Sequence, residues 1–448
     1  MRLIRIVLLL VVVRLGAQNL QPEDQKYLLS VLPLIERGEL TQAQQQLARG
    51  MKLYPQSAIL YNALGIVYRR QNNTDAAIAA FQEALKLMPA YTAAQLQLGS
   101  IYQQRSLKKE AAEMFRAAGE STTNFEALVS AGLALADCED FAGAARVLAK
   151  ARAQRPDSTS VVYNLALAEY NAADAQSAMQ TLDSVPAAQR EPDVLYLRGK
   201  VKQALARPDA GDEYLAACRA QPENENYCTD AALALVRRER AVEALELLQA
   251  GLEKSPDSVS LLSLSGLTQF RLGRYQDAIG NYTRALEHDP GLDASREGLA
   301  FLFYVTGDLE KARQVAEQGL ENPDADFYLA HLHGMILYRL SPQLRGAALV
   351  AANRALQANP KFAPSYFLRG KIKMEQNEAA SALADFERAV ALDPKYPLPY
   401  YKMSQIYARQ GRANDAEAAR RKFSDLGSLR EEEILARQTL DVLMPAQR

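Results

Sequence analysis

The sequence predicts an all-α protein, an α-solenoid in which short helices pair into hairpins that stack along the chain. Three observations predict it. Small residues recur every 33 or 34 positions, proline recurs near the end of many of these units, and Ala, Leu, Gln, Glu and Arg dominate a chain of 448 residues that lacks Trp. A single globular core stops growing at about 250–300 residues, whereas a solenoid buries each unit only against its neighbours.

One column of small residues marks twelve successive units. Its spacing is 33 or 34 residues throughout, except for one interval of 36. Single coincidences carry little weight in an Ala-rich chain, so the prediction depends on other columns that keep the same register. The members of this column are Ala43, Ala77, Ala111, Ala144, Ala178, Gly211, Ala244, Ala278, Ala312, Ala348, Ala382 and Ala416.

Other columns do keep that register. A second small residue, such as Gly65 or Gly99, lies twelve positions earlier, and a large apolar residue, such as Phe81, lies four positions later. Offsets of three, four and seven fall on one helical face, so the second half of each unit is predicted to be an amphipathic helix. Glycine or polar pairs such as Asn72-Asn73 end the first helix, and proline separates one hairpin from the next.

The unit from Ala58 to about Tyr91 resembles a tetratricopeptide repeat, and the likeness extends through twelve consecutive units from about Asp24 to Leu426. The resemblance implies a right-handed superhelix of twelve tandem repeats over residues 18–426. Central units lack the usual aromatic of the first helix, so we expect looser packing near residues 159–258. Two extra residues around Ser341-Pro342 predict a longer turn. The signature positions of the first clear unit are Tyr61, Leu64, Gly65, Tyr68, Ala77, Phe81, Ala84 and Pro89.

Residues 427–448 are predicted to form a C-terminal capping helix and a tail. The segment from Leu429 to Met444 has an amphipathic pattern with Ile434 and Leu435 among its apolar residues. A solenoid requires a polar outer face at its end, which such a helix would supply. The alternative is a helix that docks on a partner.

The first 17 residues have the pattern of a signal peptide. Arg2 and Arg5 precede the short apolar stretch from Ile6 to Val13, and small residues up to Ala17 precede a polar segment. This stretch is far shorter than the roughly 20 residues that span a bilayer as a helix. We therefore expect cleavage near Ala17 and an exported protein, periplasmic or secreted, without a membrane span after the leader is removed.

The composition argues against nucleic-acid binding and catalysis. The net charge is −1, and removing the three leader arginines from 52 basic residues leaves 49 against 53 acidic ones. No sustained basic surface is expected from this balance. His331 and His333 are two positions apart and point to different sides of a helix, so they cannot share a metal ion. Since no phosphate-binding loop or nucleophile motif is present, we expect neither a cofactor, nor a metal, nor enzymatic activity.

Two of the three cysteines lie near the facing ends of successive helices. Cys218 is about one turn before a predicted helix end, and Cys228 is about one turn into the next helix. Antiparallel neighbours would bring them to a similar level, so they are either disulfide-bonded or two small packing positions of the repeat. If they are bonded, Cys138 is an unpaired and partly buried thiol.

In tetratricopeptide repeat proteins, the first helix of each pair lines a groove that holds a peptide or a protein. The resemblance therefore implies a non-enzymatic scaffold or adaptor of the cell envelope that binds partner proteins or peptides. The alternatives are an exported protein that binds small ligands or glycans and a cytosolic regulatory module, and the oligomeric state is left open. Several groove candidates can equally pack between neighbouring first helices. They are Asn62, Arg69, Gln103, Tyr163, Tyr170, Tyr196, Lys200, Phe270, Phe301, Tyr304, Tyr338, Phe367, Lys371, Met374 and Tyr401.

Overall fold

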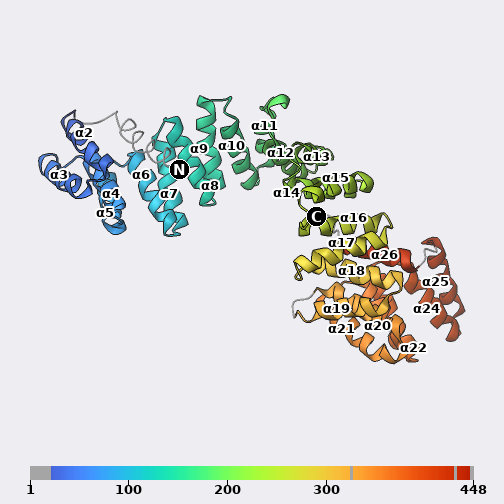
Figure 1. Ribbon diagram of the computed structural model, residues 1–448. Coiled ribbons are helices and arrows are strands. Elements are labelled where there is room, and N and C mark those ends of the chain that lie inside the picture. The colour runs from blue at the N-terminus through green and yellow to red at the C-terminus, as the bar shows by residue number, and fades with distance from the viewer. Residues whose placement is uncertain (1–21, 323–325, 428–430, 444–448) are drawn as a thin grey trace. The chain divides into compact units, whose positions relative to one another are not determined.

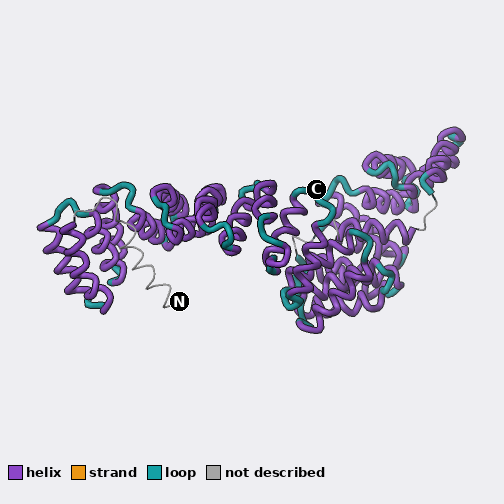
Figure 2. The backbone as a smooth tube through the Cα atoms, turned by 90° about the horizontal axis from the view of Figure 1, so that it is seen from above, coloured by secondary structure: helices purple, strands orange, loops and turns teal. Residues whose placement is uncertain are grey.

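The structure is a computed structural model that describes residues 22–322, 326–427 and 431–443. These residues form 25 α-helices and two short 3-10 helices, with no strand among them (Figure 2). The expected all-α solenoid is therefore confirmed. The predicted leader over residues 1–17 lies outside the described residues and stays a prediction.

The chain divides into two compact units, residues 1–213 and 214–448 (Figure 1). Helix α13 crosses the boundary between them. The helices up to this boundary are α2 (Pro22–Arg37), α3 (Leu40–Leu53), α4 (Ala58–Arg70), α5 (Thr74–Leu87), α6 (Thr92–Gln104), α7 (Lys108–Ser121), α8 (Phe125–Asp137), α9 (Phe141–Gln154), α10 (Thr159–Asn171), α11 (Ala175–Asp183), η1 (Ala187–Gln189), α12 (Pro192–Ala204) and α13 (Ala210–Ala220).

The second unit continues the same alternation and ends with one additional helix. Its helices are α14 (Glu225–Arg237), α15 (Ala241–Lys254), α16 (Val259–Arg271), α17 (Tyr275–His288), α18 (Asp293–Thr306), α19 (Leu309–Leu320), α20 (Phe327–Leu340), η2 (Pro342–Leu344), α21 (Arg345–Ala358), α22 (Ala363–Glu375), α23 (Ala379–Leu392), α24 (Pro397–Arg409), α25 (Ala413–Asp425) and α26 (Glu431–Leu443).

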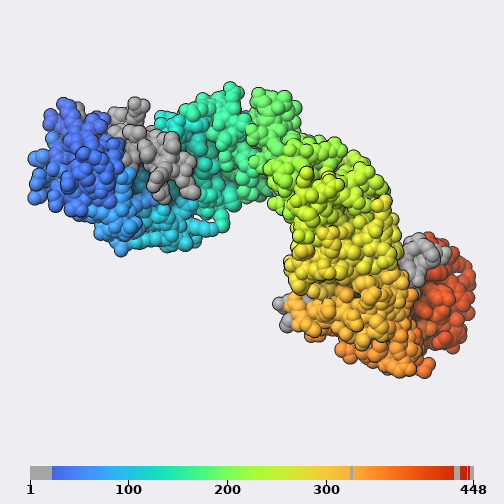
Figure 3. All heavy atoms as spheres, in the orientation of Figure 1, coloured from blue at the N-terminus to red at the C-terminus, as the bar shows by residue number. Residues whose placement is uncertain are grey.

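Within each unit, most consecutive helices pack against each other. The colours of Figure 3 accordingly follow the order of the chain. The column of small residues lies at these contacts, and its alanines are 0–3% exposed. A Cβ on Gly65 would lie 2.6 Å from the Phe81 ring, and a Cβ on Gly370 would lie 2.6 Å from the Phe386 ring. In each pair, a glycine of the first helix faces a large side chain of the second helix. This contact explains why the column of Gly65 and the column of Phe81 keep a constant separation of sixteen residues.

The turn between the two helices of a hairpin has a recurring left-handed residue. Glycine fills this position at Gly273 with a φ of 73°, whereas Ala173 holds a φ of 63° and Glu239 a φ of 63°. Glycine adopts this conformation without steric cost, while a residue with a Cβ does not. The tenth hairpin instead carries the 3-10 helix η2 at Pro342, which is the longer turn expected there.

The last helix follows the hairpin array, as the sequence predicts, and the structure shows what it packs on. Helix α26 packs on α18, within the second unit (Figure 1). Among the side chains of α26 that the structure describes, Ile434, Leu435 and Thr439 are buried. The helix therefore covers apolar surface of the array: Leu435 packs in the cluster of α18 and α20, and Ile434 packs in the cluster that includes α24 and α25.

Candidate partner-binding site

A pocket opens on the surface of the first helices α18, α20 and α22, which we call the inner face. The pocket encloses about 310 Å³, open solvent included. Aromatic and aliphatic side chains provide most of its wall, with one lysine. The lining residues are Tyr304, His331, Met335, Tyr338, Pro364, Phe367, Leu368, Lys371, Tyr396 and Leu435.

Helical spacing explains how the array assembles this pocket. On α20, His331, Met335 and Tyr338 follow each other at intervals of four and three residues, so they share one face. Phe367 and Lys371 do the same on α22. Because first helices of successive hairpins lie next to one another, these faces meet and form a continuous lining.

Cations contact the aromatic rings of this site. The Lys371 Nζ lies 4.8 Å from the centre of the Tyr338 ring and 5.5 Å from that of Phe367. The Arg345 Cζ lies 3.8 Å from the Tyr338 ring, and Arg345 also pairs with Glu375 at 2.6 Å. A rigid aromatic surface with positive charge at its edge is a common composition of a protein-binding site.

His331 contributes shape and hydrogen bonding to the pocket rather than charge. Its Nδ1 lies 3.0 Å from the hydroxyl of Ser365. Burial lowers the pKa of His331 to about 3, so the ring is neutral at physiological pH. Among the described residues, no cluster of three or more His, Cys, Asp or Glu side chains is arranged to hold a metal ion.

A hydrogen bond joins α20 to α26, and a buried carboxyl group lies on α18. The hydroxyl of Tyr328 is 2.5 Å from that of Thr439, which also donates to the carbonyl of Leu435 at 2.8 Å. Glu297 on α18 is 3% exposed, and its Oε1 has no hydrogen-bond partner. Burial raises the pKa of Glu297 to about 8, with smaller contributions from Asp326 and Asp293.

The structure divides the predicted groove residues by burial. Phe270 and Phe301 have ring centres 5.4 Å apart, and Phe301 is 0% exposed, so these rings pack between first helices and offer no surface to a partner. Tyr401, on the other hand, is 43% exposed. The buried candidates are Asn62, Phe270, Phe301, Tyr304 and Phe367, and the partly buried ones are Arg69, Gln103, Tyr163, Tyr170, Tyr196, Lys200, Tyr338, Lys371 and Met374.

Four predicted residues, Tyr304, Tyr338, Phe367 and Lys371, meet in the pocket. In the first unit, Arg69 instead donates to Ser100 at 3.1 Å, and the Lys200 Nζ lies 4.9 Å from the Tyr196 ring centre.

The sequence reasoning missed six of the lining residues. His331 and Met335 could have been found from Tyr338, because they lie seven and three residues before it on one helical face. Leu435 had no such signal, since it reaches the pocket through the position of α26.

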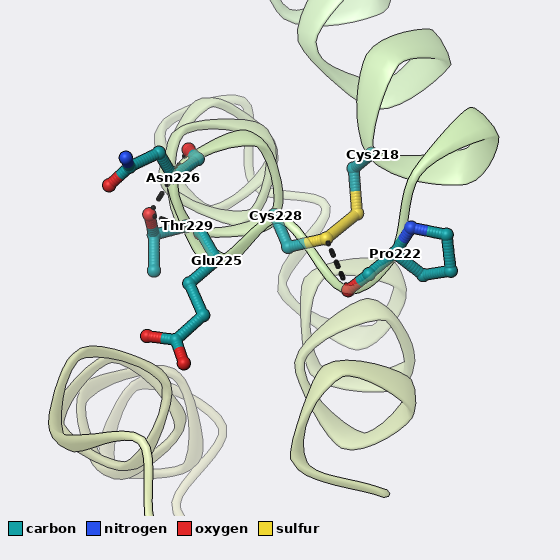
Figure 4. Close-up of a disulfide and its surroundings, with 6 residues drawn as sticks. All are labelled: Cys218, Pro222, Glu225, Asn226, Cys228 and Thr229. Atoms are coloured by element: carbon teal, nitrogen blue, oxygen red, sulfur yellow. Dashed lines mark hydrogen bonds between the residues drawn. A yellow bond between two sulfur atoms is a disulfide. The ribbon is translucent and has the colours of Figure 1, made fainter. Parts of the chain in front are cut away.

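Cys218 on α13 and Cys228 on α14 are bonded in the structure, with their Cα atoms 4.8 Å apart (Figure 4). The Sγ of Cys228 lies 3.6 Å from the carbonyl oxygen of Pro222, in the turn between the two helices. The disulfide thus joins the end of α13 to the first turn of α14, across the turn that contains Pro222. Cys138 is free and buried. Burial raises the pKa of its thiol, and the negative charge of Asp137 makes a smaller contribution in the same direction.

None of the described helices is long and apolar enough to cross a membrane.

Comparison with protein families gives matches in both units. Models described as tetratricopeptide repeat match residues 58–91, 135–201, 229–292 and 269–336, and a model described as TPR repeat matches residues 370–411.

Similar individual proteins are more distant. The Protein CTR9 homolog of Arabidopsis thaliana is 35% identical over 83 residues, which are 18% of this chain and only 8% of that protein. A structure of Naa15/Naa10 bound to HypK-THB is 16% identical, with a TM-score of 0.47, over 90% of this chain and 68% of that one. The TPR protein YrrB, described as having an unusual peptide-binding site, is 19% identical, with a TM-score of 0.34, over 44% of this chain and 100% of that one.

The family matches fall on the same hairpins that the repeat columns define. Both lines of evidence rest on the small and large residues that pack the two helices of each hairpin together. The chain belongs to the tetratricopeptide repeat proteins.

Proposed function

We propose that this protein is a non-enzymatic scaffold or adaptor of the cell envelope that holds partner proteins or peptides on its inner face. Tetratricopeptide repeat proteins bind other proteins or peptides, and repeat arrays present extended surfaces for this purpose. The observation that carries the proposal is the pocket of α18, α20 and α22, where four of the predicted groove residues meet.

The chemistry of this pocket suits a partner with an apolar anchor. Tyr338 provides partly exposed ring surface above the buried rings of Tyr304 and Phe367, and Lys371 lies at the same pocket within cation–π distance of the Tyr338 and Phe367 rings. Aromatic side chains bury a large area with few rotatable bonds, so they lose little entropy on binding. A lysine at such a site favours a partner with negative charge near its anchor.

Two observations support export. The first 17 residues have the pattern of a cleavable signal peptide. In addition, Cys218 and Cys228 are bonded, and disulfides persist chiefly in oxidising compartments. N-terminal sequencing of the protein from its native host tests this part: a start at Gln18 is expected, and a start at Met1 contradicts it.

A matched pair of charge reversals tests the binding face. Lys371→Glu reverses the charge in the pocket, whereas Lys361→Glu makes the same change at an exposed site just before α22. We expect a partner captured from envelope extracts to be lost with K371E and retained with K361E. Capture that is equal for both variants contradicts the proposed site.

A further inference from the structure

Helix α26 follows the last hairpin without joining the stack. Gly427, in a left-handed conformation with a φ of 86°, ends α25, and α26 begins at Glu431. In a stacked array each helix contacts its sequence neighbours, but α26 packs on α18. The hydrogen bond between Tyr328 and Thr439 joins residues 111 positions apart. A segment from the end of the chain therefore lies on the inner face.

The contacts of α26 coincide with the candidate binding site. Leu435 is 7% exposed and forms part of the wall of the pocket, together with Tyr304 and Phe367. It packs in the same apolar cluster as α18 and α20, while Ile434 packs in the neighbouring cluster around Phe367 and Met403. These two aliphatic side chains thus place α26 across two neighbouring apolar clusters.

The buried side of α26 is only partly apolar. Thr439 is 0% exposed and bonds to Tyr328, while the Oε1 atom of Gln438 is buried without a hydrogen-bond partner. Buried polar atoms without partners oppose docking. This interface is accordingly weaker than an apolar one of the same size, and a helix with a better match to the inner face can replace α26.

We propose that α26 is an internal occupant of the partner-binding face, and that the partner is an amphipathic helix that displaces it. This inference rests on the proposed function, because the displaced helix and the partner share one site. The partner helix carries an aliphatic pair equivalent to Ile434 and Leu435, followed within five residues by a hydroxyl group that bonds to Tyr328. The docked α26 thereby reduces binding of weaker helices.

Binding of a fluorescent peptide with the sequence of residues 431–443 to the full chain tests this proposal. A tethered helix competes at an effective concentration that reaches the millimolar range, so the wild-type chain should bind the peptide weakly. Leu435→Glu in the chain removes the anchor of α26 and changes none of the lining residues on α18, α20 and α22. We expect this variant to bind the peptide at least about ten-fold more tightly. Arg437→Glu, on the exposed side of α26, is the control and should bind like wild type.

Gln438→Leu provides a test of opposite sign that does not depend on the first variant. It replaces a buried unpartnered amide with an apolar side chain, so α26 should dock more firmly. Amide hydrogens of residues 431–443 should then exchange more slowly, and the labelled peptide should bind less tightly than to wild type. Circular dichroism at 222 nm checks that each variant is folded.

Equal peptide affinity for wild type, L435E and Q438L overturns the proposal, as does unchanged amide exchange in Q438L. Neither measurement uses a cellular partner. If they fail while K371E still loses its captured partner, then the inner face binds partners and only the role of α26 is wrong. If α26 behaves as proposed while K371E and K361E capture alike, then the proposed function fails separately.

Discussion

The buried carboxyl group of Glu297 leads to a quantitative prediction about stability. Glu297→Gln keeps the shape and polarity of the side chain and removes its ability to ionise. Burial, with smaller contributions from Asp326 and Asp293, raises the pKa of Glu297 from 4.5 to about 8 in the folded protein. In the unfolded chain the group should titrate near its ordinary value. Folding at intermediate pH must therefore take up a proton.

The sign and size follow from this difference. The stabilising contribution of the protonated carboxyl is fully present below about pH 4.5 and is lost as the pH rises through about 8. Between these values the free energy of unfolding should fall by about 1.4 kcal/mol per pH unit. Between about pH 4.5 and neutral pH the free energy of unfolding therefore falls by about 3 kcal/mol because of this group. The E297Q variant lacks the group and should not show this decrease.

Urea unfolding of the wild type and E297Q, followed by circular dichroism at several pH values from about 5 to 8, measures the effect. Other groups titrate in both proteins, so their contributions cancel in the difference. Glu246→Gln, at an exposed position in the same unit, is the control and should follow the wild type. Parallel pH dependences of the wild type and E297Q would refute the reasoning.

Three further predictions concern the hairpins. Gly370→Ala should lower the free energy of unfolding by about 1–3 kcal/mol, because its Cβ would lie 2.6 Å from the Phe386 ring; an unchanged urea midpoint contradicts the proposed packing. Ala173→Gly should raise the thermal midpoint by relieving a left-handed φ of 63°, a change worth about 1 kcal/mol, and a lower midpoint would be inconsistent with this. Reducing the disulfide between Cys218 and Cys228, which are 10 residues apart, should lower the free energy of unfolding by about 2–3 kcal/mol. Amide hydrogens near the disulfide should then exchange faster, and identical exchange with and without reductant would contradict this prediction.

The hairpin array is predictable from sequence because its packing is local. The alanines of the first column are almost fully buried, and the glycine that faces Phe81 lies sixteen residues before it in the same unit. Since both partners of such a contact belong to one hairpin, a fixed spacing in the sequence records the contact. The same reasoning places Tyr338 and Lys371 on first helices.

The exposure of the groove residues is less predictable. Phe301 is 0% exposed and Tyr401 is 43% exposed, although both are aromatic residues on first helices. Their difference depends on the neighbours supplied by adjacent hairpins. Periodicity identifies the face of a helix but does not measure how closely the next helix approaches it.

By itself, the sequence determined the all-α class, the helical hairpins and their repeated contacts, because each of these depends on residues within about one repeat. Only the tertiary structure decided which groove candidates meet in a pocket and where α26 lies. The amphipathic pattern of residues 431–443 predicts that this helix packs on an apolar surface. Because α18 and α25 belong to the same repeating array, the pattern does not distinguish between them as the packing partner. The choice between them depends on contacts such as Tyr328 with Thr439, which are too far apart in the chain for any periodicity to record.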